Sequence, residues 1–69
     1  MATLQEVKAS LELQFEIVCN HINHFKDELK NAKDPITIEE IKKEISFWTG
    51  KKVGIEDCLR YLERSMTNG

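Results

Sequence analysis

Apolar residues recur along residues 3–31 at spacings that alternate between four and three positions from Leu11 onward. This spacing keeps side chains on one face of an α-helix and predicts a long amphipathic helix. Thr3, followed three positions later by Glu6, has the pattern of a capping box at the helix start. The predicted core face consists of Leu4, Leu11, Phe15, Val18, Ile22, Phe25 and Leu29.

Leu13 and Ile17 lie off this stripe and give the same helix a second apolar face. We expect them to be protein-interface residues if the rest of the chain leaves them uncovered, and the occupant would be a partner protein or a second copy. The main stripe itself fits either an intramolecular core or a coiled-coil seam of nearly four heptads. In the second case Lys8 would lie on the seam.

A second helix is predicted after Pro35, because proline cannot continue the first one. Thr37 and Glu40 have the spacing of another capping box, and Ile36 and Ile41 have that of a hydrophobic staple. The apolar side of this helix is formed by Ile38, Ile41 and Ile45, and continues to Phe47 or Trp48.

Residues 49–54 are predicted to form a turn, because Gly50 and Gly54 bracket the basic pair Lys51 and Lys52. A third helix over residues 55–66 would follow. The chain, residues 1–69, is therefore expected to be one all-α domain of three helices, with a helix-turn-helix or winged-helix-like core that lacks a clear wing. The predicted common core is Phe15, Val18, Ile22, Phe25, Ile41, Ile45, Leu59 and Leu62.

The composition is that of a small folded protein. The chain has 69 residues, of which 41% are hydrophobic and 32% charged, and a net charge of −2. A scaffold of this size has little room for a deep catalytic cleft, and a dedicated nucleic-acid binder is usually basic. We expect a non-enzymatic protein without a membrane partner, located in the nucleus or the cytoplasm.

No catalytic, cofactor-binding or metal site is predicted. Cys19 lies near His21 and His24, but this spacing does not match the usual zinc-ligand patterns. Cys19 and Cys58 are interpreted as two free thiols, with a disulfide as the alternative.

Positive charge is concentrated around the predicted turn. In a helix-turn-helix the last helix would be the recognition helix, and the acidic residues Glu56, Asp57 and Glu63 on it would oppose phosphate contacts. Any contact with duplex DNA should therefore be weak and nonspecific, and the alternatives are a solvated charged surface or contact with an acidic protein. The candidate nucleic-acid-binding residues are Lys51, Lys52, Arg60 and Arg64.

The apolar residues of the first helix, followed by the Pro-Ile-Thr-Ile-Glu-Glu-Ile run of residues 35–41, resemble the winged-helix core of the beta subunit of general transcription factor IIE. The likeness covers residues 15–45, and the chain ends where wing strands would begin. The resemblance implies a non-enzymatic role with contacts to duplex DNA and to other transcription-factor subunits. The expected function is an interaction module of a transcription or other nucleic-acid-associated assembly, binding mainly protein subunits. The alternative is a self-associating helical adaptor, a possible homodimer, that acts through the first helix.

Overall fold

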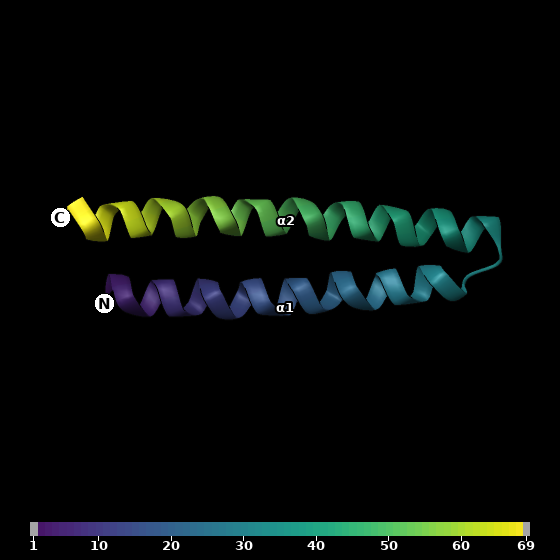
Figure 1. Cartoon of the computed structure of the whole chain (residues 1–69), viewed down its shortest axis with the longest axis horizontal. Helices are drawn as coiled ribbons and strands as arrows, with labels where there is room; N and C mark the ends of the chain where they lie inside the picture. Colours follow the sequence, from purple (N-terminus) through teal and green to yellow (C-terminus); the bar gives the residue numbers. More distant parts are fainter. Residues whose placement is uncertain (1, 69) are drawn as a thin grey trace.

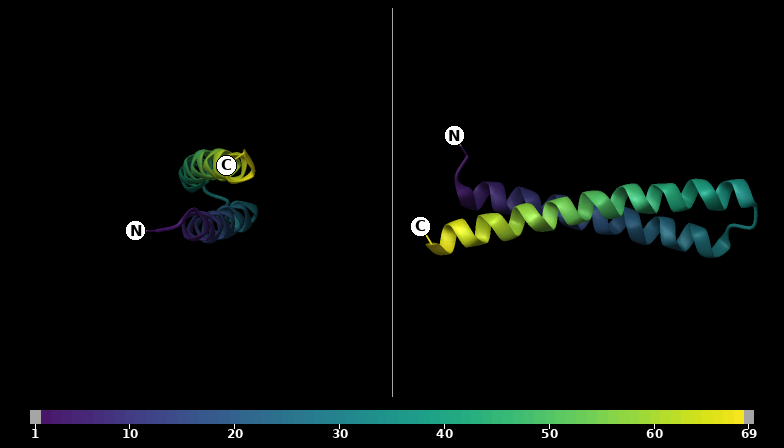
Figure 2. Two further views of the ribbon diagram at one scale, coloured as in Figure 1. Left: turned by 90° about the vertical axis from the view of Figure 1, so that its left-hand side faces the viewer. Right: turned by 90° about the horizontal axis from the view of Figure 1, so that it is seen from above.

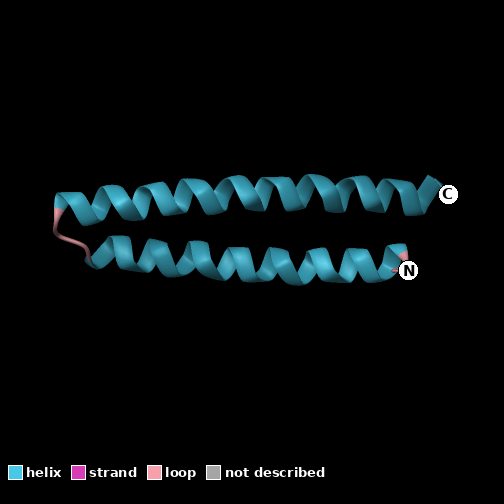
Figure 3. Ribbon diagram, turned by 180° about the vertical axis from the view of Figure 1, so that it is seen from behind, coloured by secondary structure: helices cyan, strands magenta, loops and turns pink. Residues whose placement is uncertain are grey.

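The computed structural model describes residues 2–68, which form an antiparallel pair of helices. Helix α1 (Leu4–Asn31) and the longer helix α2 (Pro35–Asn68) lie side by side along the length of α1, joined by a short link (Figure 1). The hairpin measures 52 × 18 × 14 Å. Figure 3 shows helix throughout, apart from this link and the N-terminal end. The predicted all-α class is therefore confirmed.

α1 starts where it was predicted to start, with Thr3 as its cap. The Thr3 side-chain oxygen accepts a hydrogen bond from the Glu6 backbone amide at 3.1 Å, which satisfies one of the free donors at the helix start. The helix ends at Asn31, and Ala32 follows in an extended conformation. The two helices can therefore be joined by a link of only three residues, 32–34.

The start of α2 differs from the prediction, because Asp34 and not Thr37 caps the helix. Asp34 Oδ2 accepts hydrogen bonds from the Thr37 amide at 3.1 Å and from the Thr37 hydroxyl at 3.0 Å. Pro35 is the first helical residue, where its missing N–H and fixed φ are favourable. The predicted Thr37 capping box is thus wrong, since an aspartate followed by proline provides a better helix cap three residues earlier.

Replacing Asp34 with Ala should lower the free energy of unfolding by about 1 kcal/mol, the usual cost of a lost N-cap. Thr37→Val keeps the amide donor and removes only the hydroxyl, so it should cost less. Urea denaturation followed by circular dichroism measures both. A larger loss for Thr37→Val than for Asp34→Ala would contradict the assignment of Asp34 as the cap.

The predicted turn over residues 49–54 is wrong, because α2 continues through it as one helix. Residues predicted to form a third helix are the second half of α2, so no helix-turn-helix forms within residues 2–68. The seam of α2 explains this continuity, since its spacing alternates between three and four without a break and Lys52 occupies one position. Its members are Ile38, Ile41, Ile45, Trp48, Lys52, Ile55, Leu59, Leu62 and Met66.

The core is thin. Val18, Ile22 and Ile41 are buried, whereas the other predicted core residues are only half-buried: Phe15, Phe25, Ile45, Leu59 and Leu62. Figure 2 shows the reason, because each helix is covered from one side only by the other, which it crosses at a shallow angle. The seam is therefore packed in its middle and open along both edges.

Candidate functional site

The two edges of the hairpin differ in their exposed side chains. In each helix the residues that face the other helix form the seam and occupy heptad positions a and d. Positions g and c lie beside the seam on one edge, and positions e and b lie beside it on the other. In an antiparallel pair, the g positions of both helices share one edge. Large hydrophobic residues at c and g that stay exposed are Val7 (37%), Ile17 (47%), Phe47 (56%) and Tyr61 (71%).

The opposite edge, formed by positions b and e, is mainly polar. Of the exposed large hydrophobic residues that the structure describes, only Val53 lies there. We call the edge formed by positions c and g the apolar side. The asymmetry is a property of both helices, because α1 contributes Val7 and Ile17 and α2 contributes Phe47 and Tyr61.

An open groove lies on the apolar side near the two chain termini. Val7 and Leu11 of α1 line it, together with residues of α2: Asp57, Cys58, Tyr61 and Leu62. Apart from the Asp57 carboxylate and the Tyr61 hydroxyl, these side chains offer apolar surface. The groove, which we call the terminal groove, is therefore suited to an apolar side chain of a partner.

The middle of the apolar side carries a cluster around Trp48. The His21 ring stacks on the Trp48 ring at 4.4 Å between centroids, and the Phe47 ring meets it edge-on at 5.5 Å. Lys51 Nζ lies 4.9 Å from the centroids of both Phe47 and Trp48, a cation–π arrangement. Trp48 Nε1 donates a hydrogen bond to Glu44 at 3.2 Å. These contacts hold two aromatic rings in place at the surface.

A second groove lies near the interhelical link, and its lining is acidic. It is bordered by one lysine, three glutamates and three other residues: Phe25, Glu28, Thr37, Glu40, Ile41, Lys43 and Glu44. The carboxylates of Glu28, Glu40 and Glu44 outnumber the single amine. We call this the acidic groove. The apolar side therefore has an apolar end at the termini and a negative end at the link.

The predicted interface residues, Leu13 and Ile17, are both exposed. Leu13 is 59% exposed and lies one helical turn before Ile17, at the outer position of α1. α2 does not cover either side chain, because it occupies the opposite face of α1. Their role in binding stays a prediction.

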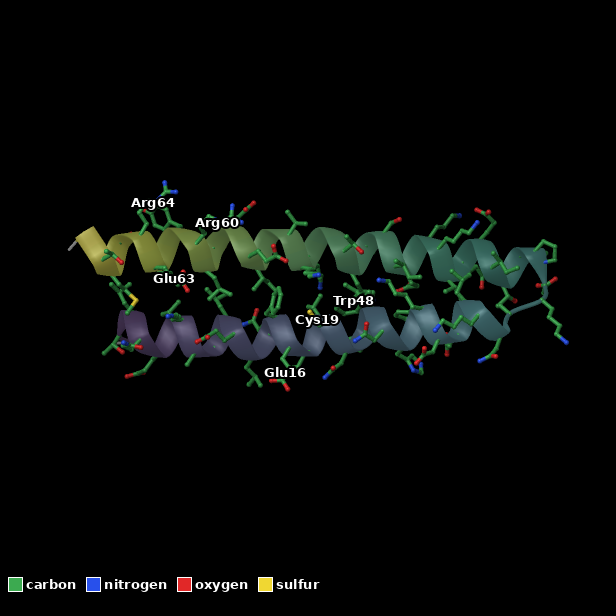
Figure 4. All side chains as sticks on the ribbon, in the orientation of Figure 1. Glu16, Cys19, Trp48, Arg60, Glu63 and Arg64 are labelled. Carbon is green, nitrogen blue, oxygen red and sulfur yellow. The ribbon has the colours of Figure 1, made fainter. Side chains whose placement is uncertain are left out.

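The four predicted nucleic-acid-binding residues do not form one patch. Lys51 lies on the aromatic rings described above, and Lys52 is half-buried in the seam with Nζ 5.9 Å from the Phe15 ring. Arg60 pairs with Asp57 at 3.5 Å, and Figure 4 shows Arg60 and Arg64 projecting away from α1. The continuous helix separates side chains that a turn would have gathered. Binding of DNA stays a prediction.

The cysteines are both free, and Cys19 lies between the helices (Figure 4) whereas Cys58 lines the terminal groove. Among residues 2–68, no group of three or more histidine, cysteine or acidic side chains is placed to hold a metal ion. Neither of the described helices has the length and apolar character needed to cross a membrane.

Comparison of the chain with protein families, with characterised proteins and with solved structures gives no match. The geometry of the hairpin therefore supplies the grounds for a function. Sequence reasoning missed three members of the apolar side: Val7, Phe47 and Tyr61. The signal is their spacing of fourteen positions, which places Phe47 and Tyr61 at the same heptad position c only if one helix continues through residues 49–54.

Proposed function

We propose that the protein is a non-enzymatic protein-interaction module that binds a partner through the apolar side of its hairpin. The observation that carries this proposal is the asymmetry between the two edges. Burial of a large apolar side chain stabilises a complex by about 1.5–3 kcal/mol. Large apolar side chains exposed together on one edge of a small soluble protein are typical of an interaction site.

The setting of this interaction is also a proposal. The family resemblance implies protein subunits of a transcription or other nucleic-acid-associated assembly. A protein partner agrees with the net charge of −2. Contact with duplex DNA would rest on Lys51, Lys52, Arg60 and Arg64, which point in different directions, so it would be weak and steeply dependent on salt.

Photo-crosslinking from the two edges tests the proposal. A benzophenone amino acid replaces Phe47 on the apolar side or, as the matched control, Val53 on the opposite edge. These residues have similar exposures of 56% and 51% and lie on the same helix. In cells that make the protein, position 47 should give protein crosslinks and position 53 should give few.

A second change makes the crosslinks specific to the apolar side. Ile17→Glu places a charge beside the site on the other helix, and it should reduce crosslinking from position 47 because the carboxylate would have to be desolvated. Equal crosslinking from positions 47 and 53, or crosslinking that Ile17→Glu leaves unchanged, would show that the apolar side is not the binding site.

A further inference from the structure

The hairpin exposes more surface than a compact protein of its mass. Its accessible surface is 5398 Å². A globular monomer of 8.0 kDa would expose about 4,450 Å², so the excess is about 950 Å². A standard protein–protein interface buries about 800 Å² on each partner. The uncovered surface of one hairpin is therefore close to the area that one side of a stable dimer buries.

We propose that a second copy of this chain covers the apolar side, so that two hairpins form a four-helix bundle. This inference rests on the proposed function and names its partner. Two antiparallel helices that cross at a shallow angle present an elongated edge that an identical edge can pack against, because helices in bundles lie about 20° from antiparallel. Ile17 lies at the middle of α1, so two-fold symmetry with the links at opposite ends, which pairs α1 with α1, brings Ile17 of one copy close to Ile17 of the other.

Two-fold symmetry allows two arrangements, with the interhelical links of the two copies at the same end of the bundle or at opposite ends. The charges favour one of them. With both links at the same end, the acidic grooves of the two copies would face each other and bring together Glu28, Glu40 and Glu44 from each. With the links at opposite ends, each acidic groove faces the terminal groove of the other copy. There the hydroxyl of the exposed Tyr61 can donate a hydrogen bond to a carboxylate of the acidic groove. We infer that the links lie at opposite ends, because the glutamates of the two acidic grooves then do not face each other, and the Asp57 carboxylate of the terminal groove is paired with Arg60.

The mass of the purified chain in solution tests the association. Sedimentation equilibrium should give twice 8.0 kDa, and the unfolding temperature should rise with protein concentration, as it does for an associating protein. The double variant Ile17→Glu/Phe47→Glu should sediment at half the native mass. Val53→Glu, on the opposite edge, should keep the native mass.

The circular dichroism of the double variant shows whether it is monomeric only because it has unfolded. If it is monomeric and has lost its circular dichroism, Tyr61→Glu is examined in its place, because this side chain is 71% exposed and contributes little to the hairpin itself. A helical Tyr61→Glu variant with weakened association supports the dimer. Native-like association in every helical apolar-side variant overturns it.

Spin labels on the link test the orientation. Lys33→Cys is labelled in a Cys19→Ala/Cys58→Ala background whose mass and melting curve match the native chain. Links at opposite ends should give a distance close to the 52 Å length of the hairpin, whereas links at the same end should give about 20–30 Å, roughly two helix spacings plus the labels. The short distance would overturn the proposed orientation.

The outcomes separate this inference from the proposed function. A native chain that is monomeric up to high concentration, with crosslinks from position 47 to a different protein, overturns self-association and leaves the interaction role standing. A monomer that forms no crosslinks from position 47 overturns both.

Discussion

Replacing Ile22 with Ala should remove most of the stability of the hairpin. Ile22 is one of the three buried hydrophobic residues in the part of the chain that the structure describes, with 6% of its surface exposed. Truncation of a buried isoleucine to alanine costs about 2–5 kcal/mol, because the lost burial is added to the cost of a cavity. Small domains have total stabilities near or below the 5 kcal/mol end of the usual range. The variant should therefore be largely unfolded at 25 °C.

The matched control is Ile36→Ala, the same substitution at a residue that is 70% exposed in the first turn of α2. It should change the free energy of unfolding by no more than about 0.5 kcal/mol. Urea denaturation of both variants, followed by circular dichroism at one protein concentration, gives the comparison. Similar losses at the two positions would show that burial in the seam does not determine stability.

The sequence predicted α1 well because its local and long-range signals agree. Thr3 provides the cap, and the apolar stripe from Leu11 to Leu29 has a regular helical spacing. The helical character of residues 36–48 was predicted for the same reason. Its cap was placed three positions late because the side chains of Asp34 and Thr37 can both serve as caps.

The continuity of α2 was not predicted, because local propensity and tertiary packing disagree there. Gly50 and Gly54 each lower helix propensity by about 1 kcal/mol relative to alanine, which favours a turn. Trp48 and Ile55, however, continue the seam on either side of Lys52, and packing against α1 outweighs the glycines. Prediction from one sequence includes the local cost of the two glycines but not the stabilisation that α2 gains by packing against α1.

The candidate site was predicted in part for the same reason. The exposure of Leu13 and Ile17 depends only on the rotational phase of α1, which was predicted correctly. Whether Phe47 and Tyr61 share an edge depends on the rotational phase of α2 through residues 49–54. A turn in that segment would change the orientation of one side chain relative to the other. The Trp48–His21 stack pairs residues from different helices, so it also depends on how the helices align.

Replacing Gly50 and Gly54 together with alanine should stabilise the protein. Both glycines lie inside α2, and an added Cβ at either position meets no atom within 4 Å. The gain should be about 1.5–2 kcal/mol, because alanine avoids the backbone entropy that glycine loses in a helix. The unfolding temperature should rise by about 6–16 °C, at 4–8 °C per kcal/mol for a domain of this size.

This change distinguishes a continuous helix from a helix-turn-helix. If residues 49–54 formed a turn that used the freedom of glycine, alanine would destabilise the protein instead. Gly54→Pro is the converse change, and it should cost about 3 kcal/mol or more because proline breaks a helix interior. A proline variant as stable as the native chain would show that α2 is interrupted at this point.

The three-residue link also has a consequence for the speed of folding. Residues 29 and 38 come together by closing a very short loop, and each later layer of the seam then forms beside one that already exists. Chains built in this way fold within microseconds to milliseconds, since little loop entropy is lost before contacts form. Pairing of the two helices should start at the link, so the helix ends near Leu4 and Met66 should pair last and separate first. Hydrogen exchange should consequently be slowest near Ile22 and Ile41 and become faster toward the chain ends.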